Sequence, residues 1–404
     1  MTENLLMIKC KEYLKTLCVD ISERCVGSNG NRKATFFFEK ELSLRGWETE
    51  MAEFEAIDWE ENGATLKSEE ENFNVLVSPY SPGFRGEGEL ISASTIEELS
   101  KVNAKNKIIF LFGEIAREQL MPKNFIFYNP EEHQKIISVL ENSGAKAIIS
   151  ATGRNAALAG GVYPFPLIED GDFDIPSVYM TEEEGLKLIP KIGKIVFLES
   201  LSKRIPGKGY NVIGKKGSNN SPKIVVTAHI DAKKGTPGAI DNATGVIVLL
   251  LLSDLLKDYN GNKLIEIVAF NGEDYYAVPG QMNYISRNKN NFNKILLNIN
   301  IDGAGYKEGL SAFSLFNLPD EILQPAKEVI NKYSGITEGI QWPQGDHSIF
   351  LQFGVPAIAV SSKWFIDNIA DQDITHTPKD NIEIVDCNKI VEISQALNTL
   401  IRSI

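Results

Sequence analysis

From about Gly209 onward the sequence alternates between short apolar runs and longer stretches with helical periodicity. Strands are predicted at 224–228, 263–271, 294–302 and 355–361, and helices at about 243–257, 319–333 and 386–402. Such alternation predicts an α/β fold, a mostly parallel (mixed) sheet with helices on both faces. Ligands of these sheets gather beyond the carboxyl ends of the strands, so residues that follow the strands are the first candidates for a functional site.

Acidic and imidazole side chains occupy these strand ends and the loops between them. They are His229, Asp231, Asp241, Glu273, Asp274, Asp302 and His376. The chain has only four histidines, and two belong to this set. Imidazole and carboxylate ligands together suit zinc, and a carboxylate can bridge two ions about 3.5–4 Å apart, an arrangement used for hydrolysis. The set therefore predicts a two-metal hydrolase.

Each of these residues also has an ordinary structural explanation when it is taken alone. Asp241, in Gly-Ala-Ile-Asp-Asn-Ala-Thr-Gly, suits the start of a helix, and Asp302 suits an Asp-Gly turn. Glu273 could lie in a solvated turn. The evidence for a metal site is the complete set in this order. Most members follow an apolar strand, and neighbouring glycine and alanine residues let the backbone approach a metal ion.

Composition narrows the class of protein. The 404 residues are 43% hydrophobic and 24% charged, as in an ordinary globular protein. The net charge of -13 argues against binding to nucleic acid or to anionic membranes. The longest apolar run, Val246–Leu252, is too short to span a bilayer, and the N-terminus lacks the features of a signal peptide. We therefore expect a cytoplasmic protein whose four cysteines are reduced core residues.

The segment before Gly209 does not continue the regular alternation of strands and helices. The first ~55 residues predict two helices and a strand, whereas residues 63–205 read as a separate α/β unit without a chemical motif. We expect one domain from residues 1–62 and 206–404, and an inserted domain from residues 63–205. His133, on a predicted helix of the insert, is expected to have a packing or surface role.

From about Gly209 onward the sequence resembles the zinc metallopeptidases that include bacterial aminopeptidases, glutamate carboxypeptidase, glutaminyl cyclase and the catalytically silent transferrin receptor. The matching signatures are His229-Ile-Asp231, Gly238-Ala-Ile-Asp241-Asn242-Ala-Thr-Gly245, Glu273-Asp274, Asn300-Ile-Asp302, Asp346-His347, Gly354-Val-Pro356 and His376-Thr-Pro-Lys-Asp380. Residues 63–205 resemble the protease-associated domain that many members carry before the His-x-Asp strand. The first residues resemble the start of the peptidase domain.

The resemblance implies a role for each matching residue. One zinc ion would be held by His229 and Asp302, a second by Asp274 and His376, and Asp241 would bridge the two. Glu273 would be the general base that takes a proton from the attacking water. Asp231 would hydrogen-bond the other ring nitrogen of His229 and fix its tautomer.

Three departures from the family pattern stand out. Asp274 replaces the second glutamate of a Glu-Glu pair, and Gly345-Asp346-His347 stands where Ser-Asp-His is usual. Thr375 stands where several relatives place a tyrosine that stabilises the tetrahedral intermediate, so another donor has to supply that contact. We expect His347 and Asp346 to support the site rather than to bind metal.

Three functional hypotheses follow. The first is a two-zinc exopeptidase, an aminopeptidase that acts on short peptides. The second is a carboxypeptidase, an amidase or a glutaminyl cyclase of the same family. The third is a non-catalytic binding protein, which the complete ligand set disfavours. We expect a peptide as the partner and neither nucleic acid nor membrane, and the assembly, including a homo-oligomer, stays open.

Overall fold

The computed structural model describes residues 2–21, 23–125, 129–154, 162–218, 221–275 and 277–404. The chain divides into two compact units, one of Met1–Ala56 with Lys208–Ile404 and one of Ile57–Gly207. It passes between them in two long strands, β1 (Glu48–Ser68) and β8 (Ile195–Lys216). The predicted domain boundaries fall inside these strands. The identity of the second unit as a protease-associated domain stays a prediction.

The first unit is built on a mixed sheet. Its strands are the last residues of β8, β9 (Lys223–His229), β10 (Leu264–Phe270), β11 (Ile295–Ile301), β12 (Ser311–Phe316), β13 (Ile336–Gly339) and β14 (Ala357–Ser362). Their order is β13-β12-β14-β11-β9-β10-β8. The four central strands β14, β11, β9 and β10 are parallel, whereas β8 and β12 run antiparallel to their neighbours β10 and β14. The predicted fold class is confirmed.

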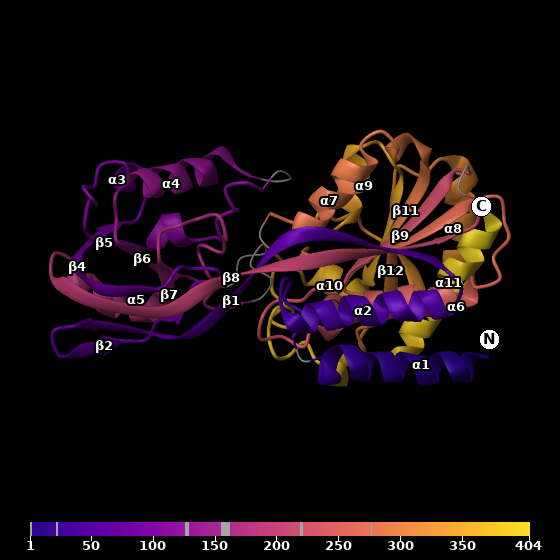
Figure 1. Cartoon of the computed structure of the whole chain (residues 1–404), viewed down its shortest axis with the longest axis horizontal. Helices are drawn as coiled ribbons and strands as arrows, with labels where there is room; N and C mark the ends of the chain where they lie inside the picture. The colour runs from indigo at the N-terminus through magenta and orange to yellow at the C-terminus, as the bar shows by residue number, and fades with distance from the viewer. Residues whose placement is uncertain (1, 22, 126–128, 155–161, 219–220, 276) are drawn as a thin grey trace. The chain divides into compact units, whose positions relative to one another are not determined.

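Helices cover both faces of this sheet. In Figure 1, α7 and α9 lie across the sheet from α2, α6 and α11. The helices of the unit are α1 (Glu3–Lys15), α2 (Asn29–Leu44), α6 (Thr244–Leu255), α7 (Pro279–Asn288), α8 (Asp320–Lys332), α9 (His347–Gln352), α10 (Lys363–Asp367) and α11 (Cys387–Ser403). Every residue of α6 from Thr244 to Asp254 is buried, as its apolar sequence requires.

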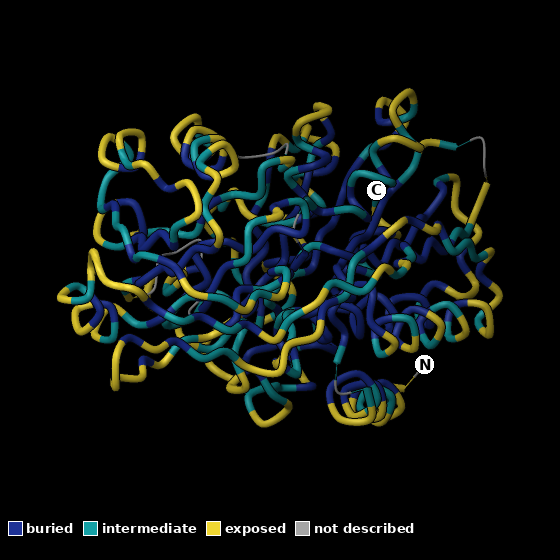
Figure 2. Tube along the Cα trace, turned by 60° about the vertical axis from the view of Figure 1, so that its left-hand side comes forward, coloured by how far each residue is buried: buried dark blue, intermediate teal, exposed yellow. Residues whose placement is uncertain are grey.

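The strand residues alternate between the two faces. In β10, Ile265 and Ile267 belong to the large core that includes α6 and α11. Glu266 accepts a hydrogen bond from the Tyr284 hydroxyl on α7 at 2.7 Å, and the ring of Phe270 lies 5.1 Å from the Tyr284 ring. This period of two places one set of side chains on each layer of helices. Figure 2 shows buried trace in the interior and exposed trace at loops and along the outer faces of helices, including the helix next to the N-terminus.

The second unit is also an α/β unit. Its strands are β2 (Glu71–Phe73), β3 (Leu76–Val77), β4 (Phe84–Ala93), β5 (Ile108–Leu111), β6 (Ala147–Thr152), β7 (Ser177–Thr181) and parts of β1 and β8, and its helices are α3 (Ile96–Leu99), α4 (Glu131–Asn142) and α5 (Glu182–Leu188). Strands β4, β5, β6 and β7 are parallel. His133 packs in this unit as predicted: it is buried, and its Nδ1 accepts the Met121 N–H at 3.1 Å. The loop predicted at 153–166 lies partly outside the described residues.

Two further expectations concern cysteines and membrane spans. Cys10, Cys18, Cys25 and Cys387 are all buried, as predicted for core residues, and none of these four forms a disulfide. Among the described residues, no helix combines the length and the apolar character that crossing a membrane would need.

Candidate metal centre

The predicted site residues come from five segments of the first unit. His229 ends β9, and Asp302 follows β11 directly. The Glu273-Asp274 pair lies between β10 and α7. Asp241 lies in the short η5 turn (Ala239–Ala243) that precedes α6, and His376 lies between α10 and α11. The carboxyl ends of parallel strands therefore bring together residues that are far apart in the sequence.

Asp241 stands between the two imidazoles. Its Oδ1 lies 3.0 Å from Nε2 of His229, and its Oδ2 lies 3.1 Å from Nε2 of His376. The same nitrogen of His229 is 3.6 Å from Oδ1 of Asp302, and that of His376 is 3.0 Å from Oδ1 of Asp274. Each oxygen of Asp241 thus faces one histidine nitrogen, and each of these nitrogens also lies beside one further acid.

The ring of His229 lies closer to a backbone carbonyl group than to the predicted carboxylate. Its Nδ1 lies 3.2 Å from the carbonyl oxygen of Asp231 and 3.8 Å from the Asp231 carboxylate. The carboxylate lies farther from Nδ1 than the carbonyl oxygen does because it is turned toward another loop, and the predicted role of Asp231 in fixing the tautomer stays a prediction. With Nδ1–H donating to the carbonyl, the assigned tautomer leaves a lone pair on Nε2, which faces the acids.

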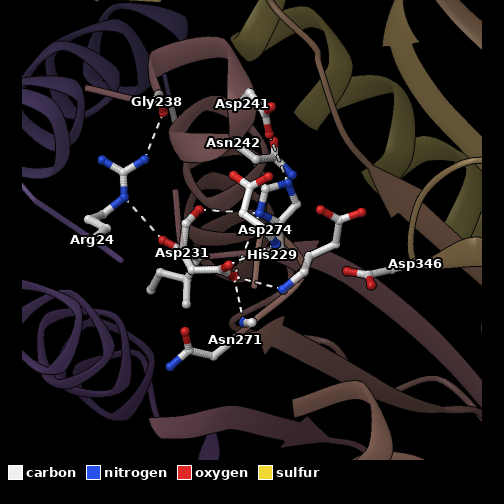
Figure 3. Close-up of polar contacts among 12 residues, drawn as sticks. Arg24, His229, Asp231, Gly238, Asp241, Asn242, Asn271, Asp274 and Asp346 are labelled. Carbon is white, nitrogen blue, oxygen red and sulfur yellow. Dashed lines mark hydrogen bonds and ion pairs between the residues drawn. The ribbon is translucent and has the colours of Figure 1, made fainter. Parts of the chain in front are cut away.

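The Asp231 carboxylate instead caps the loop that carries Glu273. Its Oδ1 accepts the N–H groups of Gly272 at 2.7 Å and of Glu273 at 3.2 Å, and its Oδ2 accepts that of Asp274 at 2.9 Å. The dashed lines from Asp231 toward the loop after Asn271 show this arrangement in Figure 3. Three successive N–H groups on one buried carboxylate fix the direction of the Glu273 and Asp274 side chains.

A second buried carboxylate, Asp380, holds the loop of Asp241. Its Oδ1 accepts the Ile240 N–H at 2.7 Å, and its Oδ2 accepts the Asp241 N–H at 3.0 Å. Burial raises the pKa of Asp380 to about 7, and the charge of Asp241 adds to that rise. Asp380 is the last residue of the His-Thr-Pro-Lys-Asp motif and had no predicted role. Its signal in the sequence is the four-residue spacing from His376, which lets one loop position both residues.

Asp346 and His347 do not join the imidazole–carboxylate cluster. Oδ1 of Asp346 accepts a hydrogen bond from Gln281 at 2.8 Å. Nε2 of His347 lies 2.9 Å from the carbonyl oxygen of Trp342, and its ring packs against the rings of Phe316 and Trp342. Burial lowers the pKa of His347, as expected for a neutral packed imidazole. The supporting role expected of this pair agrees with these contacts.

The pKa shifts show how strongly the cluster attracts positive charge. Burial alone would lower the pKa of His229 and of His376, but neighbouring acids, chiefly Asp302 for the first and Asp274 for the second, raise both well above the usual value. Burial, followed by the charge of Asp241, raises the pKa of Asp274. Burial also raises the pKa of Glu273 well above its usual value. Excess negative charge in a low dielectric favours cations.

Two buried atoms indicate where a cation fits. Nε2 of His229 and Oδ2 of Asp274 are buried and make no hydrogen bond to the described residues. His229, Asp241 and Asp274 each offer a ligand atom within 4.8 Å of the others. A buried lone pair that faces carboxylates is costly unless a proton or a metal ion lies between them. The nitrogen and oxygen donors of this set fit zinc.

Comparisons with known proteins agree with this geometry. Residues 211–401 match the sequence model of peptidase family M28. Aminopeptidase YwaD of Bacillus subtilis is 27% identical over 258 residues, which are 60% of this chain and 53% of that protein. The chain spans about half the length of the curated relatives it matches.

Two solved structures show the same fold. An aminopeptidase from Aneurinibacillus sp. strain AM-1 superposes with a TM-score of 0.76 at 18% identity and covers 98% of this chain and 93% of its own. BSAP, a zinc aminopeptidase from Bacillus subtilis, gives a TM-score of 0.76 at 19% identity over 98% and 94%. The sequence match to peptidase family M28 therefore covers residues 211–401, and the two solved structures show that the chain shares its fold with aminopeptidases over 98% of its length.

Proposed function

We propose that this protein is a zinc-dependent metallo-exopeptidase, an aminopeptidase that hydrolyses short peptides. The observation that carries the proposal is the position of Asp241, whose two oxygens each lie about 3 Å from a different imidazole. A carboxylate between two nitrogen donors is the ligand pattern that two-metal hydrolases use. The names of the related aminopeptidases point to the same activity.

Five residues would hold two zinc ions. His229 and Asp302 would hold one, Asp274 and His376 the other, and Asp241 both. When bound, such ions acidify water and polarise a carbonyl group. Asp231 and Asp380 would keep the ligands in place, because each binds backbone N–H groups of a ligand-bearing loop.

Glu273 would be the general base. Its backbone is fixed by Asp231, and its side chain is only partly exposed beside the cluster. Burial and the neighbouring acids raise its pKa, so it can accept a proton from the attacking water and return it to the leaving amine. A carboxylate with a raised pKa suits both halves of this transfer.

Hydrolysis assays test the proposal. Aminoacyl-p-nitroanilides and unblocked dipeptides should be cleaved, N-acetylated versions of the same peptides should not, and a chelator should abolish cleavage until zinc is restored. Cleavage of N-blocked peptides from the carboxyl end would support a carboxypeptidase instead. Cyclisation of N-terminal glutamine without peptide cleavage would support a glutaminyl cyclase. A zinc-loaded protein that acts on none of these substrates would overturn the proposal.

A further inference from the structure

Arg24 is a fully buried cation at the edge of the candidate metal centre. Only 1% of the residue is exposed, although arginine is rarely buried unless its charge is compensated. It lies between the η1 turn (Thr16–Asp20) and α2, a segment outside the residues 211–401 that match the family model. Nothing in the alternation of strands and helices draws attention to this residue.

The guanidinium binds four backbone carbonyl groups. Its Nε donates to Ile230 at 3.0 Å, Nη2 donates to Gly238 at 2.7 Å, and Nη1 donates to Pro237 at 2.8 Å and to Leu17 at 2.6 Å. Three of these acceptors belong to the loop between β9 and η5. Figure 3 shows the guanidinium of Arg24 and its hydrogen bond to Gly238. The planar guanidinium of Arg24 thus forms hydrogen bonds to both ends of that loop.

This loop joins two of the proposed zinc ligands. His229 precedes it and Asp241 ends it, so the separation of the two ligands depends on the path of the loop. Gly238 adopts the left-handed conformation (φ 57°, ψ 49°) immediately before η5. A Cβ atom there would lie 2.6 Å from the Asp241 carbonyl oxygen and 2.8 Å from Nη2 of Arg24. Both the glycine and the arginine are therefore part of one close-packed turn.

The backbone around Arg24 contacts the other ligand-bearing loop. The Arg24 carbonyl oxygen accepts a hydrogen bond from Nδ2 of Asn31 at 2.9 Å. Asn31 and Asn271 exchange a reciprocal pair of amide hydrogen bonds at 2.7 and 2.9 Å. Asn271 directly precedes the residues whose N–H groups bind Asp231. The segment from Arg24 to Asn31 therefore contacts the β9–η5 loop and the loop of Asp274, two of the segments that carry proposed zinc ligands.

We propose that Arg24 is a positioning residue of the metal centre: its fork of hydrogen bonds to Ile230, Pro237 and Gly238 sets the spacing of His229 and Asp241 for zinc. The inference rests on the proposed function, because it assigns these two residues to zinc. Lysine keeps the charge but presents a single donor atom instead of a planar fork, so it cannot reproduce the four bonds. The N-terminal segment thereby completes a site whose ligands all come from the family-matched residues.

Zinc affinity of the full-length chain tests this role. Arg24→Lys should raise the dissociation constant for zinc about 10- to 100-fold, the range typical when a residue that orients a metal ligand is lost. Arg24→Met should raise it further because methionine donates no hydrogen bond to the loop. The affinity is measured by competition with a chromophoric chelator, which needs no substrate.

Arg45→Lys is the matched control. Arg45 is also a buried arginine of the first unit, with an 8% exposed side chain, and it binds Asp254 and Glu41 at 2.9 Å each. Among its described contacts none lies in the β9–η5 loop. The control should lower the melting temperature of the chelator-treated protein about as much as Arg24→Lys does, yet leave zinc affinity unchanged.

The outcomes separate this inference from the proposed function. If the wild-type chain binds no zinc, the proposed function fails and the inference fails with it. If the wild-type chain binds zinc and Arg24→Lys binds it equally well, only the positioning role is overturned. If Arg24→Lys does not fold, zinc affinity is measured for Gly238→Ala instead, because this change disturbs the same turn with Arg24 present. Wild-type zinc affinity in that variant would also overturn the positioning role.

Discussion

The two units use the same architecture but treat their buried acids differently. In the second unit, Asp170 is 3% exposed, and its carboxylate accepts the N–H groups of Lys123 at 3.0 Å and Asp172 at 2.7 Å. In the first unit, Asp241 and Asp274 face imidazoles instead, and Oδ2 of Asp274 has no hydrogen-bond partner among the described residues. The α/β architecture by itself therefore does not indicate which unit binds a metal ion. The hydrogen-bond partners of its buried acids reveal which loops are built for a cation.

The largest effect is expected at Glu273. Glu273→Gln should retain both zinc ions and lower kcat by about 10²–10⁴-fold or more, because the amide cannot accept the proton of the attacking water. Steady-state hydrolysis and elemental analysis of the same sample measure both quantities. Loss of zinc together with activity would make Glu273 a ligand instead.

Two histidine variants compare the units directly. His376→Ala should empty the site formed with Asp274 and leave the ion at His229 bound, because the two imidazoles face different oxygens of Asp241. His133→Ala, in the second unit, removes a buried hydrogen-bond acceptor and should lower stability only. Zinc content per chain distinguishes the variants. Equal zinc in both would remove the distinction drawn between the units.

The pH dependence of the chelator-treated protein should reflect the unpaired charge of the first unit. Neighbouring acids raise the pKa of His229 and His376 despite burial, and burial raises that of Asp346 to about 7. The native state then binds more protons than the unfolded state near neutral pH, so its free energy of unfolding should rise as pH falls from about 8 to about 6.

Zinc should reverse this trend. Zinc binds the deprotonated form of its ligands, and protons compete with it more strongly at lower pH. The stabilisation that zinc provides should therefore decrease as pH falls from about 8 to about 6. Melting curves with a chelator and with added zinc, at both pH values, measure the two slopes. A chelator-treated protein that loses stability on acidification over this range contradicts the raised pKa values.

The smallest effect is expected at Asp170. Asp170→Asn keeps the shape of the side chain but can accept only at its single oxygen, so one buried N–H loses its partner. The free energy of unfolding should fall by about 1–3 kcal/mol, the usual cost of an unsatisfied buried group. Zinc content should stay at the wild-type value. A fall in zinc content would show that the second unit contributes to metal binding.

The main strands and helices of the first unit were predictable because their hydrophobic periodicity is strong. The site residues were predictable because they follow the ends of strands. The strands at β9, β10, β11 and β14 and the helices α6, α8 and α11 lie within three residues of the predicted ranges. The predicted site residues also meet in space, although their roles stay predictions. Short elements without strong periodicity, such as β13 and α9, were missed because four to six residues hold too little pattern.

The supporting contacts were less predictable than the ligands. Whether Asp231 turns to the imidazole or to the loop after β10 depends on which N–H groups tertiary packing brings near it. Arg24 was missed for the same reason: its four acceptors are backbone carbonyl groups, which leave no trace in the side-chain sequence.

The central claim is that Asp241 is shared by two zinc ions. Elemental analysis of the wild-type chain and of Asp241→Asn, after dialysis against a weak chelator, tests it most directly. We predict two zinc ions per wild-type chain and weakened binding at both sites in the variant, because a neutral amide cannot compensate two cations. A wild-type chain that holds no more than one ion, or a variant that keeps two tightly bound ions, would contradict the account.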